Sequence, residues 1–183
     1  MAQRHDELLT AGVRVYAISI DSPERNAAMV DKLSLPFPYL SDPDRSEAII
    51  PYGLADEKDD RMLSLPALVA LTPDREEVFR FVSRDFAERL PENEVVAAMQ
   101  RLNLSPTTQD MPRLGRIEAG PRSLSLPSLR IYLRGARFAA LAMGLRHGHH
   151  AQEIKEDSKA YVAEMDRFTE ALDWLAEQQG SDG

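Results

Sequence analysis

Carboxylates and histidines are the residues of this chain that could carry chemistry, because the sequence contains no cysteine. Asp21 and Asp42 each follow a short apolar stretch, and two carboxylates that lie close together can act as general acid and general base. Both residues also stand directly before a predicted helix start, and a helix-capping role explains them without any catalysis. The pattern therefore favours capping over acid–base chemistry.

A second candidate group is the histidine cluster His147, His149 and His150, since neutral imidazole is a common ligand of zinc and copper. No carboxylate stands at ligand spacing beside these histidines, and no tetrahedral ligand set is completed. We therefore expect a solvated turn, with no metal site and no cofactor. The chain also has no glycine-rich phosphate loop and no Ser/His/Asp signature.

Composition excludes further classes of function. The net charge of −8 argues against a nucleic-acid-binding protein, because phosphate binding needs a basic surface. The first ten residues are polar and predict no signal peptide, and no apolar run approaches the roughly 20 residues that span a bilayer. We expect a cytoplasmic chain with no membrane segment, no disulfide and no thiolate metal site.

The pattern of the first half predicts alternating helices and strands. The residues before Gly12 end a helix, and the β-branched run Val13–Ile20 predicts an interior strand covered on both faces. Ser22 and Pro23 supply the N-cap and first position of the next helix. A short extended piece at 39–40 precedes a second predicted helix over 43–53, which Asp42 caps. This order predicts an α/β fold with a parallel sheet.

The second half begins with a predicted hairpin and ends with helices. A strand over 67–72, a turn at 72–75 and a return strand over 77–83 precede a helix over 91–102. Residues 103–126 form a linker of unusual length, expected to wrap over the domain or to be partly disordered. Residues 127–145 and 151–179 predict an αα-hairpin, either docked on the domain or forming a dimer interface. The first of its helices has a second apolar face, made of Ile131, Phe138, Leu141 and Leu145, and small residues that allow close backbone approach.

Three stretches together resemble a known family. "GVRVYAISIDSPERNAAMVDKLSLPFPYLSDPD" is similar to the middle of a peroxiredoxin of the AhpC/TSA or bacterioferritin-comigratory type, a thioredoxin-fold family. "LPALVALTPDREEVFRFVSRD" resembles its terminal β-hairpin, and "LPENEVVAAMQRL" resembles its last helix. The resemblance covers residues 1–102 and rests on the order and spacing of the stretches, since no single motif is diagnostic.

The resemblance implies a site and a gap. Pro66 matches a proline, often cis, that faces the active-site cysteine in thioredoxin-fold proteins, and we expect a cis bond there. Asp21, Ser22 and Pro23 would lie near the rim of that site. Arg61 is the nearest candidate for the arginine that supports the thiolate in many peroxiredoxins, although the spacing does not assign it that role. The cysteine and the central strand of the sheet would precede Met1.

The expected fold is therefore a partial thioredoxin-like sheet flanked by helices, with residues 1–102 as a redoxin domain, 103–126 as a linker and 127–179 as a helical extension. Either the chain is a fragment, or another segment or chain fills the central position. The family activity is thiol-dependent peroxide reduction in antioxidant defence, with peroxide and a thiol reductant as partners and a homodimer as one arrangement. This chain contains no nucleophile for that step. The alternative is a cysteine-free adaptor that assembles through its C-terminal helices.

Overall fold

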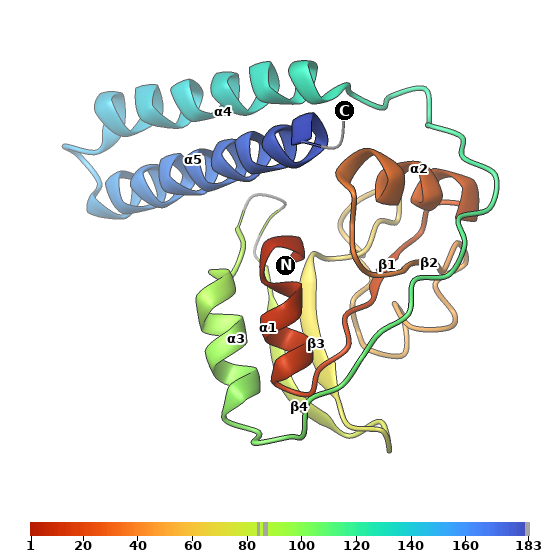
Figure 1. Cartoon of the computed structure of the whole chain (residues 1–183). Helices are drawn as coiled ribbons and strands as arrows, with labels where there is room; N and C mark the ends of the chain where they lie inside the picture. The colour runs from red at the N-terminus through yellow and green to blue at the C-terminus, as the bar shows by residue number, and fades with distance from the viewer. Residues whose placement is uncertain (84, 86–87, 182–183) are drawn as a thin grey trace. The chain divides into compact units, whose positions relative to one another are not determined.

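The computed structural model describes residues 1–83, 85 and 88–181 and divides into two compact units (Figure 1). The first unit comprises residues 1–86 and 90–121, and the second comprises residues 87–89 and 122–183. No helix in the described part of the chain is both long enough and apolar enough to cross a membrane.

The first unit mixes helices and strands in the order that the sequence predicts, except that no helix forms over 43–53. Its elements are the 3₁₀ helix η1 (Ala2–Arg4), α1 (His5–Thr10), β1 (Ala17–Ser19), α2 (Pro23–Leu33), β2 (Tyr39–Ser41), β3 (Ala67–Leu71), β4 (Glu77–Val82) and α3 (Glu92–Gln100). The mixed α/β class is therefore confirmed.

The strands form two separate two-stranded sheets (Figure 1). β1 and β2 are parallel, with Ile18 opposite Leu40. β3 and β4 are antiparallel, with Leu68 opposite Phe81 and a register shift beyond Ala70. Among the described residues, no strand pairing joins one sheet to the other.

The core of this unit lies between α1 and α3. Leu8, Val96 and Met99 are its central buried side chains, and Ala70 and Phe79 of the hairpin pack against them. Full burial of a leucine such as Leu8 contributes about 2 kcal/mol to stability. This cluster attaches both helices to the β3–β4 hairpin.

Gly12 ends α1 with a positive φ of 80°, as the sequence predicts. A Cβ at this position would stand 2.5 Å from the Leu104 Cβ and 2.6 Å from the Ser105 carbonyl oxygen. The linker after α3 therefore packs directly on the turn. Its contact with the domain continues where the Thr107 N–H donates to the Leu9 carbonyl at 2.9 Å.

Two expectations for the sheet region are wrong. The segment 43–53 forms a series of turns rather than a helix, because the Asp42 carboxylate binds backbone N–H groups that a helical ladder would otherwise use. The strand predicted over 13–20 is regular only at Ala17–Ser19, and the side chains of Ile18 and Leu40 are exposed. Ile18 and Leu40 are paired across the two strands, so the face of the β1–β2 sheet that carries them lacks the cover of a sheet interior.

The second unit consists mainly of α4 (Leu126–His147) and α5 (Gln152–Ser181), which pack against each other. Leu133, Met165 and Leu172 form its buried core. Arg137 Nε donates to the Asp166 carboxylate at 2.6 Å, and Arg130 pairs with Asp173. The helices are thus held by one apolar seam and by ion pairs along its border.

Candidate functional site

The candidate site lies where β1 and β2 end. In sheets with parallel strands, ligands bind beyond the carboxyl ends of the strands, where the following loops and helix starts converge. Asp21, Ser22 and Pro23 follow β1, and Asp42 follows β2. Three of the four residues that the resemblance implies for the active site are thus consecutive and connect β1 to α2.

Ser22 is the N-cap of α2 and Pro23 occupies the first turn, as the sequence predicts. The Ser22 side chain makes no hydrogen bond to the helix backbone. Hydrogen bonds from the backbone N–H of Glu24 and from the Ser22 side chain hold the pKa of the Glu24 carboxyl below its ordinary value. Asp21 is exposed and pairs with Arg25 at 3.7 Å.

A buried polar network behind this turn centres on Asn26, whose side chain is 2% exposed. Its Nδ2 donates to the Leu40 carbonyl at 2.9 Å and to Ser41 Oγ at 3.0 Å. Its Oδ1 accepts from Ser19 Oγ at 2.9 Å. Asn26 therefore ties α2 to both strands of the parallel pair. The sequence reading missed it, although an asparagine inside an amphipathic helix is a signal for a buried hydrogen-bonding role.

Asp42 is a buried structural cap. Its carboxylate accepts hydrogen bonds from the N–H groups of Glu47, Ala48 and Ile49 at 3.1, 3.0 and 2.9 Å. Burial would raise the pKa of Asp42, but these hydrogen bonds and the nearby Arg45 charge together hold the pKa below its ordinary value. Asp21 and Asp42 thus have separate local partners: Asp42 binds N–H groups of the turns over 43–53 rather than capping the helix expected there.

Pro66, the fourth residue assigned by the resemblance, begins the segment that enters β3. Its carbonyl accepts the Ser83 N–H at 2.8 Å. No peptide bond among the described residues is cis, so the prediction of a cis Pro66 is wrong; trans is the intrinsically favoured isomer. Pro66 directly precedes β3, whereas Asp21–Pro23 follow β1. Among the described residues, no strand pairing joins the β3–β4 sheet to the β1–β2 sheet.

Arg61 is engaged in its own loop. Its Nε donates to the Asp59 carboxylate at 2.9 Å, and hydrogen bonding from the Arg61 side chain lowers the pKa of Asp59 to about 2. The Arg61–Asp59 pair lies within an exposed loop, so Arg61 is not a free cation beside Asp21–Pro23.

The histidines lie in the second unit. His147 is in the last turn of α4, and the rings of His149 and His150 are 3.8 Å apart. Among the described residues, no group of three or more histidine, aspartate or glutamate side chains could hold a metal ion.

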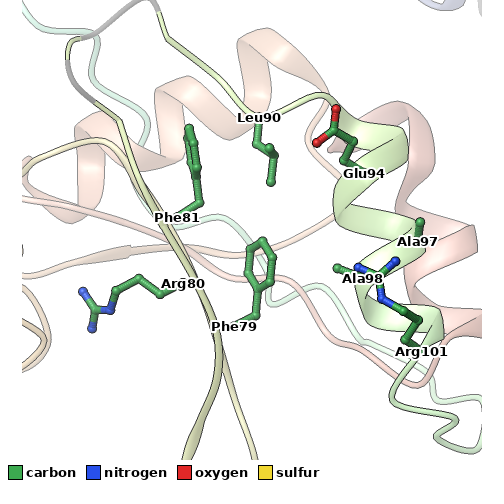
Figure 2. Close-up of a pocket in the computed structure, with 8 residues that line it drawn as sticks. All are labelled: Phe79, Arg80, Phe81, Leu90, Glu94, Ala97, Ala98 and Arg101. Atoms are coloured by element: carbon green, nitrogen blue, oxygen red, sulfur yellow. The ribbon is translucent and has the colours of Figure 1, made fainter.

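A pocket of about 380 Å³ opens between β4 and α3 in the first unit (Figure 2). Phe79 and Phe81 point from β4 toward α3, whereas Arg80 points away from them. Arg80 instead pairs with Glu77 and donates to the Tyr52 carbonyl. The sequence predicts these phenylalanines only as apolar strand surface, and the charged residues Glu94 and Arg101 also line the pocket.

The arrangement around β1 and β2 can bind and orient through backbone groups, serines and a helix start, but it holds no thiol. The chain has no cysteine, and the Asp21 and Asp42 carboxylates are engaged by Arg25 and by backbone N–H groups, respectively. The residues present can therefore border a reaction centre but cannot supply a sulfur nucleophile.

Comparison with known proteins agrees with this architecture. Residues 1–77 match the model of the AhpC/TSA family. Two curated relatives from two strains of Mycobacterium tuberculosis, both named "Putative peroxiredoxin", are 46% identical to this chain over 52 residues. The matched region covers 28% of this chain and 32% of each relative, so the chain spans about a third of their length. Residues 1–77 are accordingly similar to the AhpC/TSA family, which supports a peroxiredoxin-like redoxin domain in this part of the chain.

Proposed function

We propose that this chain contributes the part of a thiol-dependent peroxidase that borders the active site, while a cysteine outside residues 1–183 supplies the nucleophile. That cysteine would belong to the same polypeptide or to a second chain. Peroxide and a thiol reductant are the partners, and peroxide removal in antioxidant defence is the role. The residue ranges are 1–102 for a thioredoxin-like redoxin domain, 103–126 for the linker and 127–179 for the helical extension.

The proposed reaction is that of the redoxin class. A cysteine thiolate attacks one oxygen of the peroxide, the O–O bond breaks, and the departing oxygen takes a proton to leave as water or an alcohol. The sulfur is oxidised to a sulfenic acid. A thiol reductant then condenses with the sulfenic acid to a disulfide with loss of water, and a second thiol returns the cysteine to its reduced state.

The observation that carries the proposal is the separation of the two sheets. Ala17 and Ser19 use their backbone groups to bond with the β2 segment. Because alternate residues of a strand point their N–H and C=O groups to opposite edges, Ile18 presents its backbone on the edge away from β2. β3 pairs with β4 alone among the described strands. Among the described residues, the other edges of β1 and β3 therefore carry no further strand, and pairing near β3 is limited to the segment before it, where the Leu65 N–H donates to the Leu54 carbonyl at 2.7 Å.

A single added strand between β1 and β3 would join the two sheets and bring the candidate site residues to one place. A strand inserted parallel to β1 and antiparallel to β3 would end beside the residues that follow β1 and beside the start of β3. Its carboxyl end would therefore lie between Asp21–Pro23 and Pro66. A cysteine placed there would be bordered by all four residues, which is the arrangement that the family resemblance implies.

The test is to isolate the protein from its source through a C-terminal tag, without denaturant, and to treat it with hydrogen peroxide and dimedone, which traps sulfenic acid. We expect a dimedone-modified cysteine in a peptide that is covalently continuous with this chain or copurifies with it. We also expect the 183-residue chain alone to consume no peroxide. Isolated protein with neither a modified cysteine nor peroxide consumption would overturn the proposal. The family matches do not favour the cysteine-free adaptor.

A further inference from the structure

The outer face of α4 is apolar and exposed. Ile131, Phe138 and Leu145 are 74%, 51% and 75% exposed, and Leu141 is 38% exposed. These four residues form what we call the outer seam. Residues seven apart on an α-helix drift by only about 20° around its axis, so Ile131, Phe138 and Leu145 form one straight row. Such a row at heptad spacing is typical of a helix that packs against another helix.

The residues that pack against α5 lie on another side of α4. Leu133 is buried against Met165 and Leu172, with Leu129 and Ala136 beside it. The outer seam is therefore not the seam that holds the second unit together. Large exposed apolar patches mark interaction surfaces, and the outer seam gathers four large apolar side chains along one side of α4.

The geometry points to a second copy of this chain as the occupant of the outer seam, with the two α4 helices antiparallel. The row is symmetric about Phe138, since Ile131 and Leu145 lie at equal distances on either side of it. A two-fold axis at Phe138 therefore places Phe138 against its own counterpart, and Ile131 against Leu145 of the other copy. A two-fold interface requires this kind of self-complementary surface.

The residues of α4 between Ile131 and Leu145 fit the same antiparallel packing. Antiparallel alignment about Phe138 brings Arg134 and Gly135 of one copy level with Leu141 and Ala142 of the other. A Cβ built on Gly135 has no heavy atom within 4 Å, so the second helix has room for close approach there. The Arg134 guanidinium lies over the Phe138 ring, 5.7 Å from its centroid, and its aliphatic stem adds apolar surface beside Leu141 of the other copy.

Charge favours a protein partner over an anionic membrane surface. Arginines on an apolar helix can bind anionic lipid, and α4 carries four of them in its sequence. However, Arg130 and Arg137 already pair with Asp173 and Asp166 of α5. Asp166 and Asp173 of α5 thus neutralise two of the four arginine charges of α4. The acidic side chains of α5 would also repel an anionic lipid surface.

Sedimentation velocity of the full chain, over about a hundred-fold range of concentration, tests the assembly. We expect a concentration-dependent dimer at twice the 20.5 kDa mass of the chain. Phe138→Glu should weaken dimerisation by about 100-fold, since two phenylalanines lose their burial and two carboxylates meet. Ile50→Glu is the matched control, because Ile50 is 54% exposed and lies in the first unit; it should leave the dimer intact. Circular dichroism checks that both variants remain folded.

Cysteine cross-linking tests the antiparallel register. Because the chain has no cysteine, each introduced cysteine is the only one that can react. With a short bis-maleimide, Phe138→Cys should cross-link to itself. Ile131→Cys and Leu145→Cys should each fail alone but cross-link when mixed in equal amounts. Self-cross-linking of Ile131→Cys would indicate parallel packing and overturn the register. A monomer at every concentration would overturn the proposal, and Phe138-dependent binding of that monomer to phosphatidylserine vesicles would assign the seam to a lipid surface instead.

Discussion

The side-chain amide of Gln109 spans the backbone of Val15. Its Oε1 accepts the Val15 N–H at 2.9 Å, and its Nε2 donates to the Val15 carbonyl at 2.6 Å. Val15 stands two residues before Ala17, so its backbone groups point to the same edge by which Ala17 bonds to the β2 segment. Gln109 therefore extends the pairing of β1 by one residue with a side chain from the linker. His5 Nε2 contacts the same Oε1 at 3.1 Å.

Replacing Gln109 with alanine should destabilise the first unit by about 1–2 kcal/mol, because the backbone groups of Val15 lose both partners. Urea denaturation measures the change, and hydrogen exchange should show a less protected Val15 amide. Gln152→Ala is the control, since the Gln152 amide bonds Glu156 on an exposed helix surface. Equal effects of the two changes would show that the Gln109 contact contributes nothing specific.

Asn26→Ala should destabilise the chain by about 2–4 kcal/mol, since it leaves several buried polar groups of α2, β1 and β2 without partners. Asn93→Ala changes the same residue type on the exposed side of α3 and should stay within about 0.5 kcal/mol of the parent. The free energies of unfolding in urea compare the two. A small effect at Asn26 would mean that water replaces its hydrogen bonds.

The Asp42 cap predicts a pH dependence of stability. The folded-state pKa of Asp42 lies below its ordinary value of 3.8, so its ionised form contributes stability above that value. The contribution is lost as the pH falls through the depressed folded-state pKa. Asp42→Asn should therefore cost about 1–2 kcal/mol at neutral pH, because an amide has one acceptor oxygen and no charge. The difference from the parent should narrow as the pH falls below 3.8.

Urea titrations at several pH values measure this difference. Asp74→Asn, in the exposed turn between β3 and β4, is the control and should follow the parent at every pH. A difference between Asp42→Asn and the parent that stays constant from neutral to acidic pH would contradict the role of the ionised carboxylate.

Gly12→Ala should destabilise the chain by more than Gly53→Ala. Both glycines have positive φ, at 80° and 64°, so each change carries the left-handed backbone cost of about 1 kcal/mol. Only at Gly12 would the new methyl group meet the linker, at Leu104 and Ser105; the Cβ position at Gly53 is open. Thermal unfolding gives the stability difference, and limited trypsin digestion should cut the linker faster in Gly12→Ala. Equal destabilisation by the two changes would show that the linker moves away from the new methyl group at no cost in folding free energy.

The sequence by itself determined the features that depend on neighbouring residues. Gly12 ends a helix because it accepts a left-handed backbone, and Ser22 with Pro23 begins one because their own conformations suit that position. The helices and strands of the first half, apart from the segment 43–53, follow from apolar periodicity and from local start and stop residues. The absence of a sulfur nucleophile in these residues is likewise a matter of composition.

The tertiary structure decided what depends on distant partners. The segment 43–53 has helix-like sequence, yet the buried Asp42 carboxylate gathers its N–H groups into turns. Val13–Ile20 has the composition of an interior strand, but its burial depends on what covers the faces of the β1–β2 sheet, and Tyr16 and Ile18 are exposed. Asn26 and Gln109 become structural centres because residues far along the chain place carbonyl and N–H groups beside them. Local propensity acts between neighbours, whereas hydrogen-bond satisfaction and burial are set by the whole fold.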